Sequence, residues 1–306
     1  LKKMKPTAYL VCTARGGIID EAALAAAIES GTIAGAALDV FAAEPTTESP
    51  LFGLDSVVVT PHLGASTAEA QDKAGDTIAE QVALALGGEF VPFAVNVAAA
   101  EANETVRPYL GLAEQLGAIF AGLADALPAE VEIEYSGELA GYDTRILTLS
   151  VQKGLFGAVS ADPISYVNAP QYAEAHGITV TSTSTSSSVD WINLISISGG
   201  GHQIAGTLVG KRGEARLVQI DGHSLDVPPS PNLIVIHNDD RPGVIGRVGT
   251  ALGDAGVNIA DMDVGRSASQ GAAVMVIATT APVDDDVVAT LTAADGVTSV
   301  AVVGRR

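Results

Sequence analysis

The first 65 residues alternate between apolar runs and turn residues in a pattern that predicts strands and one helix. Strand-like apolar runs occupy residues 8–11, 35–40 and 56–60. Between the first two, residues 20–31 (DEAALAAAIESG) place apolar side chains at helical spacing between a capping aspartate and a closing glycine. Near-continuous apolar strands are typical of parallel sheets covered on both faces. This order of strand, helix and strand predicts an α/β fold of the Rossmann type.

Two longer helices are predicted after these strands. Residues 66–87 place Ile78, Val82 and Leu86 on one helical face, and a pair of glycines closes the segment. A further helix is expected over residues 106–127, where Pro128 ends it. Residues 98–101 (AAAE) between the two helices are read as a linker.

The middle of the chain predicts a domain of mixed helices and strands. The runs VEIEYSG and RILTLSVQKGLF are read as strands, and residues 160–177 as a turn followed by a helix. The segment TVTSTSTSSS is low in complexity, but it is short and alternating, which argues against a linker. The sequence therefore predicts an α+β domain here.

The last 75 or so residues, after the PPSP boundary at 228–231, give the clearest pattern. Strand-like runs and helical stretches follow one another in the order β-α-β-β-α-β. That order is the split βαβ arrangement of ferredoxin-like domains. We expect a small sheet with its helices on one face.

Composition limits the possible partners and the compartment. The chain has 306 residues, of which 47% are hydrophobic and 17% charged, which fits two to three domains with a large core. A formal net charge of -20 argues against nucleic acid and anionic membranes as partners. The single cysteine, Cys12, excludes an internal disulfide and favours a reducing, cytoplasmic location. We expect neither a membrane segment nor a metal site.

Three ionisable side chains follow the ends of successive predicted strands. Arg15 lies in a glycine-rich turn, Glu44 follows the second strand, and His62 follows the third. Because parallel strands share one carboxyl edge, where ligands bind in open α/β sheets, these groups are expected to converge. A guanidinium can orient a 2-hydroxy acid, and an imidazole held by a carboxylate can take the hydroxyl proton as hydride leaves. Each residue alone could be an ordinary turn residue, but the shared pattern favours a catalytic set.

The sequence around this set resembles a known enzyme family. ARGGIIDEAALAAAIESGTIAGAALDVFAAEP and TPHLGAST are similar to signatures of the D-2-hydroxyacid dehydrogenases, and the whole chain is similar to the long-form phosphoglycerate dehydrogenases among them. The resemblance implies that Arg15, Glu44 and His62 are catalytic. It also implies NAD as the cofactor, bound by Thr13, Ala14, Arg15, Asp39, His62, Leu63, Gly64 and Ala65.

The resemblance implies a reaction as well. This is the NAD-dependent oxidation of 3-phospho-D-glycerate to 3-phosphohydroxypyruvate, the first step of L-serine biosynthesis. The family's glycine-rich turn, ribose-binding acidic residue and substrate domain would precede Leu1, so we expect an N-terminally truncated chain that is inactive alone. Two alternatives remain open: a non-catalytic amino-acid-binding or oligomerisation module, and a dehydrogenase for another small 2-hydroxy acid.

The C-terminal region resembles the ACT domain family through HNDDRPGVIGRVGTALGDAGVNIADMDVGR. This resemblance implies feedback by L-serine bound at His237, Asn238, Asp240 and Asn258, and a homo-oligomer formed through paired ACT domains. Asn238 departs from the aromatic residue of some relatives. The alternative is that this motif is only a polar turn before a helix.

The middle region resembles the intervening domain of the same enzymes, also called the allosteric substrate-binding domain. Its segment GKRGEARLVQIDGHS gathers the basic residues Lys211, Arg212, Arg216 and His223, which could bind a phosphate or carboxylate effector. A solvated hairpin tip is the slightly favoured alternative. The expected domains are 1–65 (C-terminal half of the NAD-binding domain), 66–100 (helix and return segment), 101–228 (intervening domain) and 229–306 (ACT domain).

Overall fold

The computed structural model describes residues 1–97, 102–124, 126–266 and 272–304. The chain divides into two compact units, Leu1–Ala83 and Leu84–Arg306, and each is described by itself. The predicted linker at 98–101 lies outside the described residues.

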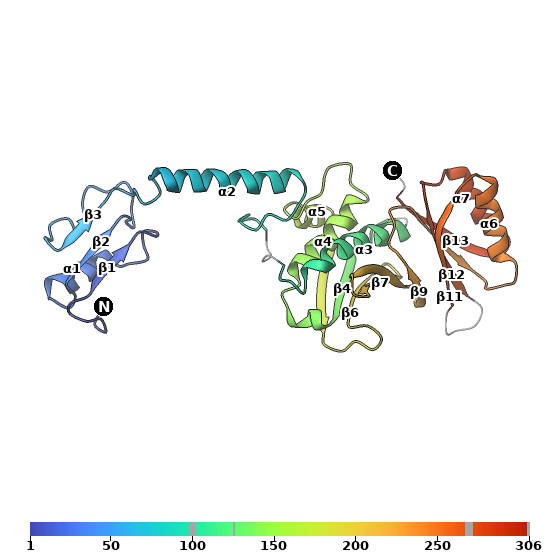
Figure 1. The fold of residues 1–306 in the computed structure, drawn as a ribbon, viewed down its shortest axis with the longest axis horizontal. Helices are drawn as coiled ribbons and strands as arrows, with labels where there is room; N and C mark the ends of the chain where they lie inside the picture. Colours follow the sequence, from blue (N-terminus) through green and yellow to red (C-terminus); the bar gives the residue numbers. More distant parts are fainter. Residues whose placement is uncertain (98–101, 125, 267–271, 305–306) are drawn as a thin grey trace. The chain divides into compact units, whose positions relative to one another are not determined.

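The first unit contains a three-stranded parallel sheet (Figure 1). The strands lie in the order β1 (Tyr9–Cys12), β2 (Gly35–Leu38) and β3 (Val57–Val59). Helix α1 (Glu21–Glu29) connects β1 to β2, and Oδ1 of Asp20 caps it by accepting from the N–H of Ala23 at 2.9 Å. Leu24 of α1 is fully buried in the core of this unit. These observations confirm the predicted Rossmann-like arrangement.

Helix α2 (Ala68–Leu86) confirms the long helix predicted after β3. None of its residues is buried, and its apolar residues Ile78, Val82 and Leu86 are exposed. The predicted helical spacing is therefore correct, and the apolar face that it creates is exposed.

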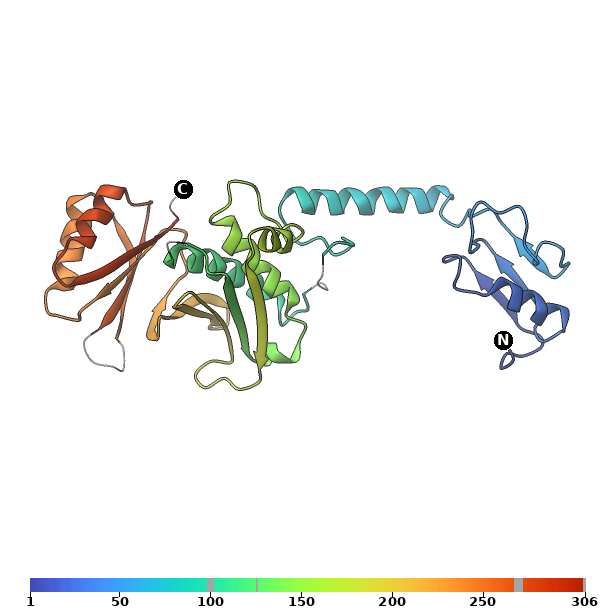
Figure 2. The ribbon, with the colours of Figure 1, turned by 180° about the vertical axis from the view of Figure 1, so that it is seen from behind.

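The second unit begins with a six-stranded sheet covered by helices (Figure 1, and from behind in Figure 2). The strands lie in the order β5-β4-β6-β7-β8-β9, and all neighbours are antiparallel except β4 and β5. Their bounds are β4 (Glu130–Gly137), β5 (Thr179–Thr185), β6 (Asn193–Gly199), β7 (His202–Val209), β8 (Glu214–Ile220) and β9 (His223–Val227). The low-complexity segment TVTSTSTSSS forms the edge strand β5 and is not a linker.

Among the described residues, this sheet is accompanied by the α-helices α3 (Leu110–Leu123), α4 (Arg145–Gly157) and α5 (Ala169–Ala175), and by the short 3-10 helices η1 (Arg107–Tyr109) and η2 (Glu138–Gly141). Helices α3 and α4 cross at two glycines. A Cβ atom on Gly117 would lie 2.1 Å from the carbonyl oxygen of Val151, and one on Gly154 would lie 1.8 Å from that of Glu114. Only glycine permits the two backbones to come this close.

The strand prediction for RILTLSVQKGLF is wrong, because this segment is helix α4. The apolar residues Leu147, Leu149 and Val151 alternate as they would in a strand. Helix α4 is buried on most of its surface, however, with Ile146, Leu147, Val151 and Leu155 at most 1% exposed. A helix buried on most sides loses the polar face that marks helical periodicity, so the apolar pattern does not separate helix from strand.

The C-terminal part confirms the predicted ferredoxin-like order. It comprises β10 (Leu233–Asn238), α6 (Val244–Asp254), β11 (Ile259–Arg266), β12 (Ala273–Thr279), α7 (Asp285–Thr292) and β13 (Val297–Val303). The sheet order is β11-β12-β10-β13. Helices α6 and α7 pack on one face of this sheet, as expected.

The opposite face of the β10–β13 sheet shares a core with the preceding region. Val235, Val276 and Val303 belong to the same buried cluster as Leu116 and Phe120 of α3. The ferredoxin-like part is therefore packed on both faces. Within the described residues, no helix is both long and apolar enough to cross a membrane.

Candidate active site

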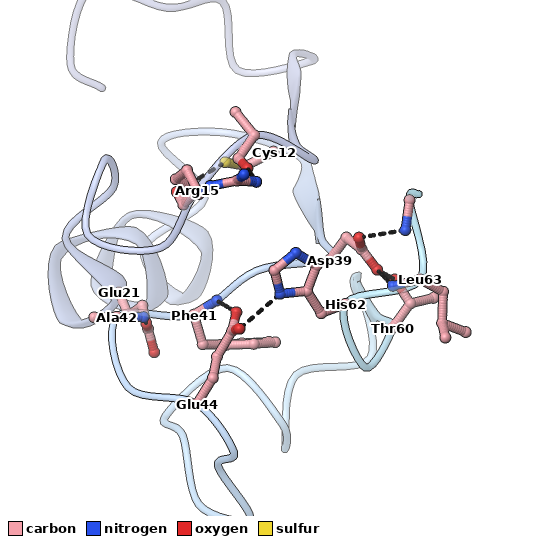
Figure 3. A network of polar contacts seen from close by, with 12 residues as sticks. Cys12, Arg15, Glu21, Asp39, Phe41, Ala42, Glu44, Thr60, His62 and Leu63 are labelled. Carbon is pink, nitrogen blue, oxygen red and sulfur yellow. Dashed lines mark hydrogen bonds and ion pairs between the residues drawn. The ribbon is translucent and has the colours of Figure 1, made fainter. Parts of the chain in front are cut away.

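Glu44 and His62 form a hydrogen-bonded pair beyond the carboxyl ends of β2 and β3 (Figure 3). The Nδ1 atom of His62 lies 2.7 Å from Oε2 of Glu44. The other carboxylate oxygen, Oε1, accepts from the backbone N–H of Phe41 at 2.8 Å. Two of the three predicted catalytic side chains are therefore in direct contact at the predicted edge of the sheet.

The partners of Glu44 determine which nitrogen of His62 carries a proton. The Phe41 N–H, followed by the bond to His62, holds the pKa of Glu44 below its ordinary value. The carboxyl group is therefore ionised at neutral pH and can only accept hydrogen bonds. Nδ1 of His62 must donate, which leaves Nε2 of a neutral imidazole free to accept a proton.

Asp39 fixes the loop that carries His62. It is 5% exposed, and its Oδ1 accepts from Thr60 Oγ1 and from the N–H of Leu63, both at 2.6 Å. Its Oδ2 accepts from the N–H of Gly64 at 2.8 Å. The Thr60 hydroxyl is the main cause that lowers the pKa of Asp39. Asp39 thus acts as an ionised anchor around which residues 60–64 turn.

His62 has an unusual backbone conformation within this loop. Its φ is 56°, in the left-handed region that residues with a Cβ rarely adopt, and its N–H donates to the carbonyl oxygen of Asp39 at 2.9 Å. Backbone strain of this kind persists only where neighbouring contacts enforce it. The bonds to Asp39 provide that enforcement.

Arg15 lies in the loop after β1, as predicted. Its Nη1 donates to the carbonyl oxygen of the neighbouring Ala14 at 2.9 Å, and the Cys12 thiol lies 3.9 Å from the Arg15 carbonyl oxygen. The residue is exposed, so the guanidinium is accessible to solvent. In the described contacts Arg15 is bonded within its own loop, while Glu44 and His62 are bonded to each other (Figure 3).

A cavity of 450 Å³ opens beside the Glu44–His62 pair. Its apolar wall includes Phe41 and Phe52, whose rings meet edge to face with centroids 5.5 Å apart. Asp39, Thr60 and His62 line its polar side. The arrangement of an apolar wall with a few polar groups is typical of sites for small ligands.

All of the residues expected to hold NAD except Asp39, which is buried after β2, lie in two exposed loops that approach each other. Thr13, Ala14 and Arg15 follow β1, and residues 62–65 follow β3, and all of them are exposed. A Cβ atom on Gly64 would lie 3.0 Å from Oδ2 of Asp39 and 4.0 Å from the carbonyl oxygen of Thr13. This close approach fits a backbone cradle for a cofactor. Asp39 supports the cradle from below through the loop 60–64.

The predicted effector residues lie at three places: His237 and Asn238 in β10, Asp240 in the loop after it, and Asn258 before β11. The Asn238 side chain is 5% exposed, and its Oδ1 accepts from the N–H of Asp240, whose φ is 47°. The Nδ2 atom of Asn238 is buried and has no hydrogen-bond partner among the described residues. The His237 side chain is bonded to Asp221 and Ser299 instead. Asn258 is exposed before β11.

The basic residues of the middle region do not gather at one place. Lys211 and Arg212 are exposed in the turn between β7 and β8, whereas His223 is buried at the start of β9. The seven residues of β8 lie between this turn and His223. At a rise of about 3.3 Å per residue, the strand separates them by about 20 Å. Arg216 is paired with Glu214 and Asp226, both at 3.2 Å. The predicted cluster is therefore divided between the two ends of β8.

Several residues of these sites were not predicted from the sequence. Thr60 and the Phe41 N–H have no distinctive signal, because their roles depend on how two loops meet. A signal did exist for a second cluster, since three of the five histidines lie at positions 202, 223 and 237. Their common partner, Asp221, lies among them in the sequence.

Three segments of the chain match known families of domains. Residues 1–64 match the NAD binding domain of D-isomer specific 2-hydroxyacid dehydrogenases. Residues 105–221 match the D-3-phosphoglycerate dehydrogenase intervening domain, and residues 232–296 match the ACT domain. One chain thus combines the NAD binding domain of D-isomer specific 2-hydroxyacid dehydrogenases with an intervening domain and an ACT domain.

Curated relatives share most of this sequence. A Mycobacterium bovis protein named D-3-phosphoglycerate dehydrogenase is 44% identical over 299 residues, which cover 96% of this chain and 57% of that protein. Proteins of the same name from Mycobacterium leprae and Synechocystis are 48% and 39% identical, covering 85% and 97% of this chain and 50% and 55% of theirs. The chain is therefore similar, over most of its length, to proteins named D-3-phosphoglycerate dehydrogenase, and its three matched segments belong to the NAD binding, intervening and ACT domain families. It spans about half the length of these relatives.

Proposed function

We propose that these residues belong to an enzyme that oxidises 3-phospho-D-glycerate to 3-phosphohydroxypyruvate with NAD, the first step of L-serine biosynthesis. NAD, when bound, supplies the hydride acceptor. The observation that carries the proposal is the 2.7 Å bond between His62 Nδ1 and Glu44 Oε2. It orients the imidazole so that Nε2 can take the substrate hydroxyl proton, while the adjacent carboxylate stabilises the resulting imidazolium.

Arg15 is proposed to orient the substrate. Its planar guanidinium can form two parallel bonds with a carboxylate. The present bond to the Ala14 carbonyl is an exposed local contact, which a charged ligand can replace. The loops at 13–15 and 62–65, together with Asp39 beneath them, are proposed to hold the nicotinamide half of NAD.

The test is an assay of NADH formation with 3-phospho-D-glycerate, in the polypeptide that contains this chain and in its His62→Gln variant. We expect turnover that depends on His62. Comparable turnover in the reverse direction, measured as NADH oxidation with glyoxylate or hydroxypyruvate, would favour the alternative of a dehydrogenase for another small 2-hydroxy acid. The 306-residue chain is assayed in the same way, and we propose that it is inactive by itself.

A regulatory role of the ACT domain is proposed on a separate observation. The buried Nδ2 of Asn238, which has no partner among the described residues, is a donor available to a ligand carboxylate. Asp240 supplies a carboxylate nearby that can accept from an ammonium group. L-Serine carries both groups, so we propose it as the effector, together with Asn258 from a paired ACT domain. Pairing of ACT domains would make the protein a homo-oligomer.

Calorimetry with L-serine tests the effector. We expect saturable heat with the 306-residue chain and a loss of that heat in Asn238→Ala. Flat heats with a folded chain would contradict serine binding. Binding without any effect on turnover in the NADH assay would favour the alternative of a non-catalytic amino-acid-binding module.

Domain boundaries and location complete the proposal. We propose domains at 1–65, 66–100, 101–228 and 229–306, which the three matched segments support. A cytoplasmic location is supported by the single buried cysteine, Cys12, which forms no disulfide.

A further inference from the structure

Asp221 lies where the six-stranded sheet meets the β10–β13 sheet. It forms the two-residue turn between β8 and β9 together with Gly222, and both residues have a positive φ (47° and 75°), as an Asp-Gly hairpin turn favours. Its side chain is 15% exposed. A largely buried carboxylate needs strong partners to persist.

Both carboxylate oxygens of Asp221 have such partners. Oδ1 accepts from the backbone N–H of Gln203 at 2.9 Å. Oδ2 lies 3.0 Å from Nδ1 of His202 and 3.0 Å from Nε2 of His237. His202 begins β7, whereas His237 is in β10. One oxygen atom therefore holds imidazoles that belong to two different sheets.

The charge of Asp221 fixes the direction of these bonds. Burial raises the pKa of Asp221, but the hydrogen bonds from His237, Gln203 and His202 outweigh it and lower the pKa to about 2. An ionised carboxylate only accepts, so Nδ1 of His202 and Nε2 of His237 must carry protons. The Nδ1 atom of His237 lies 3.2 Å from Oγ of Ser299 in β13.

The position of His237 connects this contact to the loop after β10. Successive side chains of a strand point to opposite faces, so His237 and its neighbour Asn238 face different ways. The His237 side chain reaches Asp221, while the Asn238 side chain accepts from the N–H of Asp240 in the loop. A displacement of Asn238 therefore moves the backbone that also carries His237.

A cavity of about 580 Å³ opens beside this contact, and His202, His237 and Ser299 are among the residues that line it. The two parts approach each other closely elsewhere, since a Cβ atom on Gly265 of β11 would lie 2.6 Å from the carbonyl oxygen of Ser224 in β9. Asp221 therefore ties His202 to His237 at the edge of a gap between the two sheets.

We propose that Asp221 is a positioning residue that couples the loop after β10 to the six-stranded sheet, through His237 on one side and His202 on the other. The coupling consists of two hydrogen bonds, in which one ionised carboxylate oxygen of Asp221 accepts from an imidazole N–H of each histidine. The inference rests on the proposed function only for the identity of the effector. The coupling itself is a property of the chain without a ligand.

Imidazole ¹⁵N spectra of the 306-residue chain at neutral pH test the proposal. We expect His202 as the Nδ1–H tautomer and His237 as the Nε2–H tautomer. Asn238→Ala is expected to shift the His202 signals, although the two residues belong to different sheets. In the Asp221→Asn background the same substitution is expected to leave the His202 signals unchanged.

Asp226→Asn is the matched control, because Asp226 is a carboxylate of the adjacent strand β9 that pairs with Arg216. The response of His202 to Asn238→Ala should persist in it. If Asp221→Asn does not fold, His237→Gln is the second variant and should also abolish the response.

This experiment tests the coupling and the identity of the effector separately. No shift of His202 on Asn238→Ala in the otherwise unchanged folded chain, or a shift that survives in folded Asp221→Asn, would overturn the coupling. A normal response to Asn238→Ala with no response to added L-serine would leave the coupling supported and contradict serine as the effector.

Discussion

The Nδ1 atom of His62 lies 2.7 Å from Oε2 of Glu44, although the two residues are 18 positions apart and come from different loops. Two further contacts hold this pair in place, and neither of them involves Arg15, the third residue of the proposed catalytic set. The Phe41 N–H holds Glu44, and Asp39 holds the loop of His62. The orientation of the imidazole is therefore set by the backbone of the sheet edge.

Removing either member of the pair should affect turnover more than stability. We expect His62→Gln to lower kcat of the polypeptide assayed for NADH formation by about 10²- to 10⁴-fold, the usual contribution of a general base. Glu44→Gln should lower kcat by about 10- to 100-fold, because a charge-assisted bond becomes a neutral one. Steady-state NADH formation measures both values. Unchanged kcat in either folded variant would contradict the assigned roles.

Gly64→Ala should disturb the same loop through its contact with Asp39. The added Cβ would lie 3.0 Å from Oδ2 of Asp39, and three hydrogen bonds prevent that carboxylate from moving away. A misplaced His62 should reduce kcat about tenfold. Gly53→Ala is the control, since its Cβ meets nothing within 4 Å. Equal kcat for the two variants would contradict a role of Asp39 in positioning the loop.

Much of the fold follows from the sequence for identifiable reasons. Asp20 caps α1 as its position predicts, and the β-α-β-β-α-β order is legible because each strand is short and bounded by turn residues. Helix α4 was misread because it is buried on most of its surface and lacks a polar face. The basic residues Lys211, Arg212 and His223 show a related difficulty. Residues that are close in sequence along a β-hairpin can lie at opposite ends of a strand, here β8.

The crossing of α3 and α4 gives a prediction about stability. Gly117→Ala should lower the free energy of unfolding by about 1–3 kcal/mol, because its Cβ would overlap the carbonyl of Val151. Gly111→Ala, on the same helix, meets nothing within 4 Å and should raise it by about 0.5–1 kcal/mol through helix propensity. Urea unfolding followed by circular dichroism compares the two. A neutral Gly117→Ala would show that the helices can separate without cost.

Asp221 should make stability depend on pH in the acid range. Its pKa is lowered to about 2 in the folded chain, so its contribution is present above the ordinary value of 3.8 and is lost as the pH falls towards 2. We expect the chain to be about 1–2 kcal/mol more stable than Asp221→Asn at pH 7. The difference should shrink between about pH 4 and pH 2. Urea unfolding midpoints of the chain and of Asp221→Asn, measured across this pH range, test the prediction. A stability difference that stays constant with pH would contradict the lowered pKa of Asp221.

The tautomer of His62 is the most direct test of the proposed catalytic pair. Long-range ¹⁵N–¹H correlation at neutral pH, with His62 assigned through His62→Gln, distinguishes a protonated Nδ1 from a protonated Nε2. We predict that the neutral ring carries its proton on Nδ1 and that this preference is lost in Glu44→Gln. A neutral His62 protonated at Nε2 in the otherwise unchanged chain would contradict it.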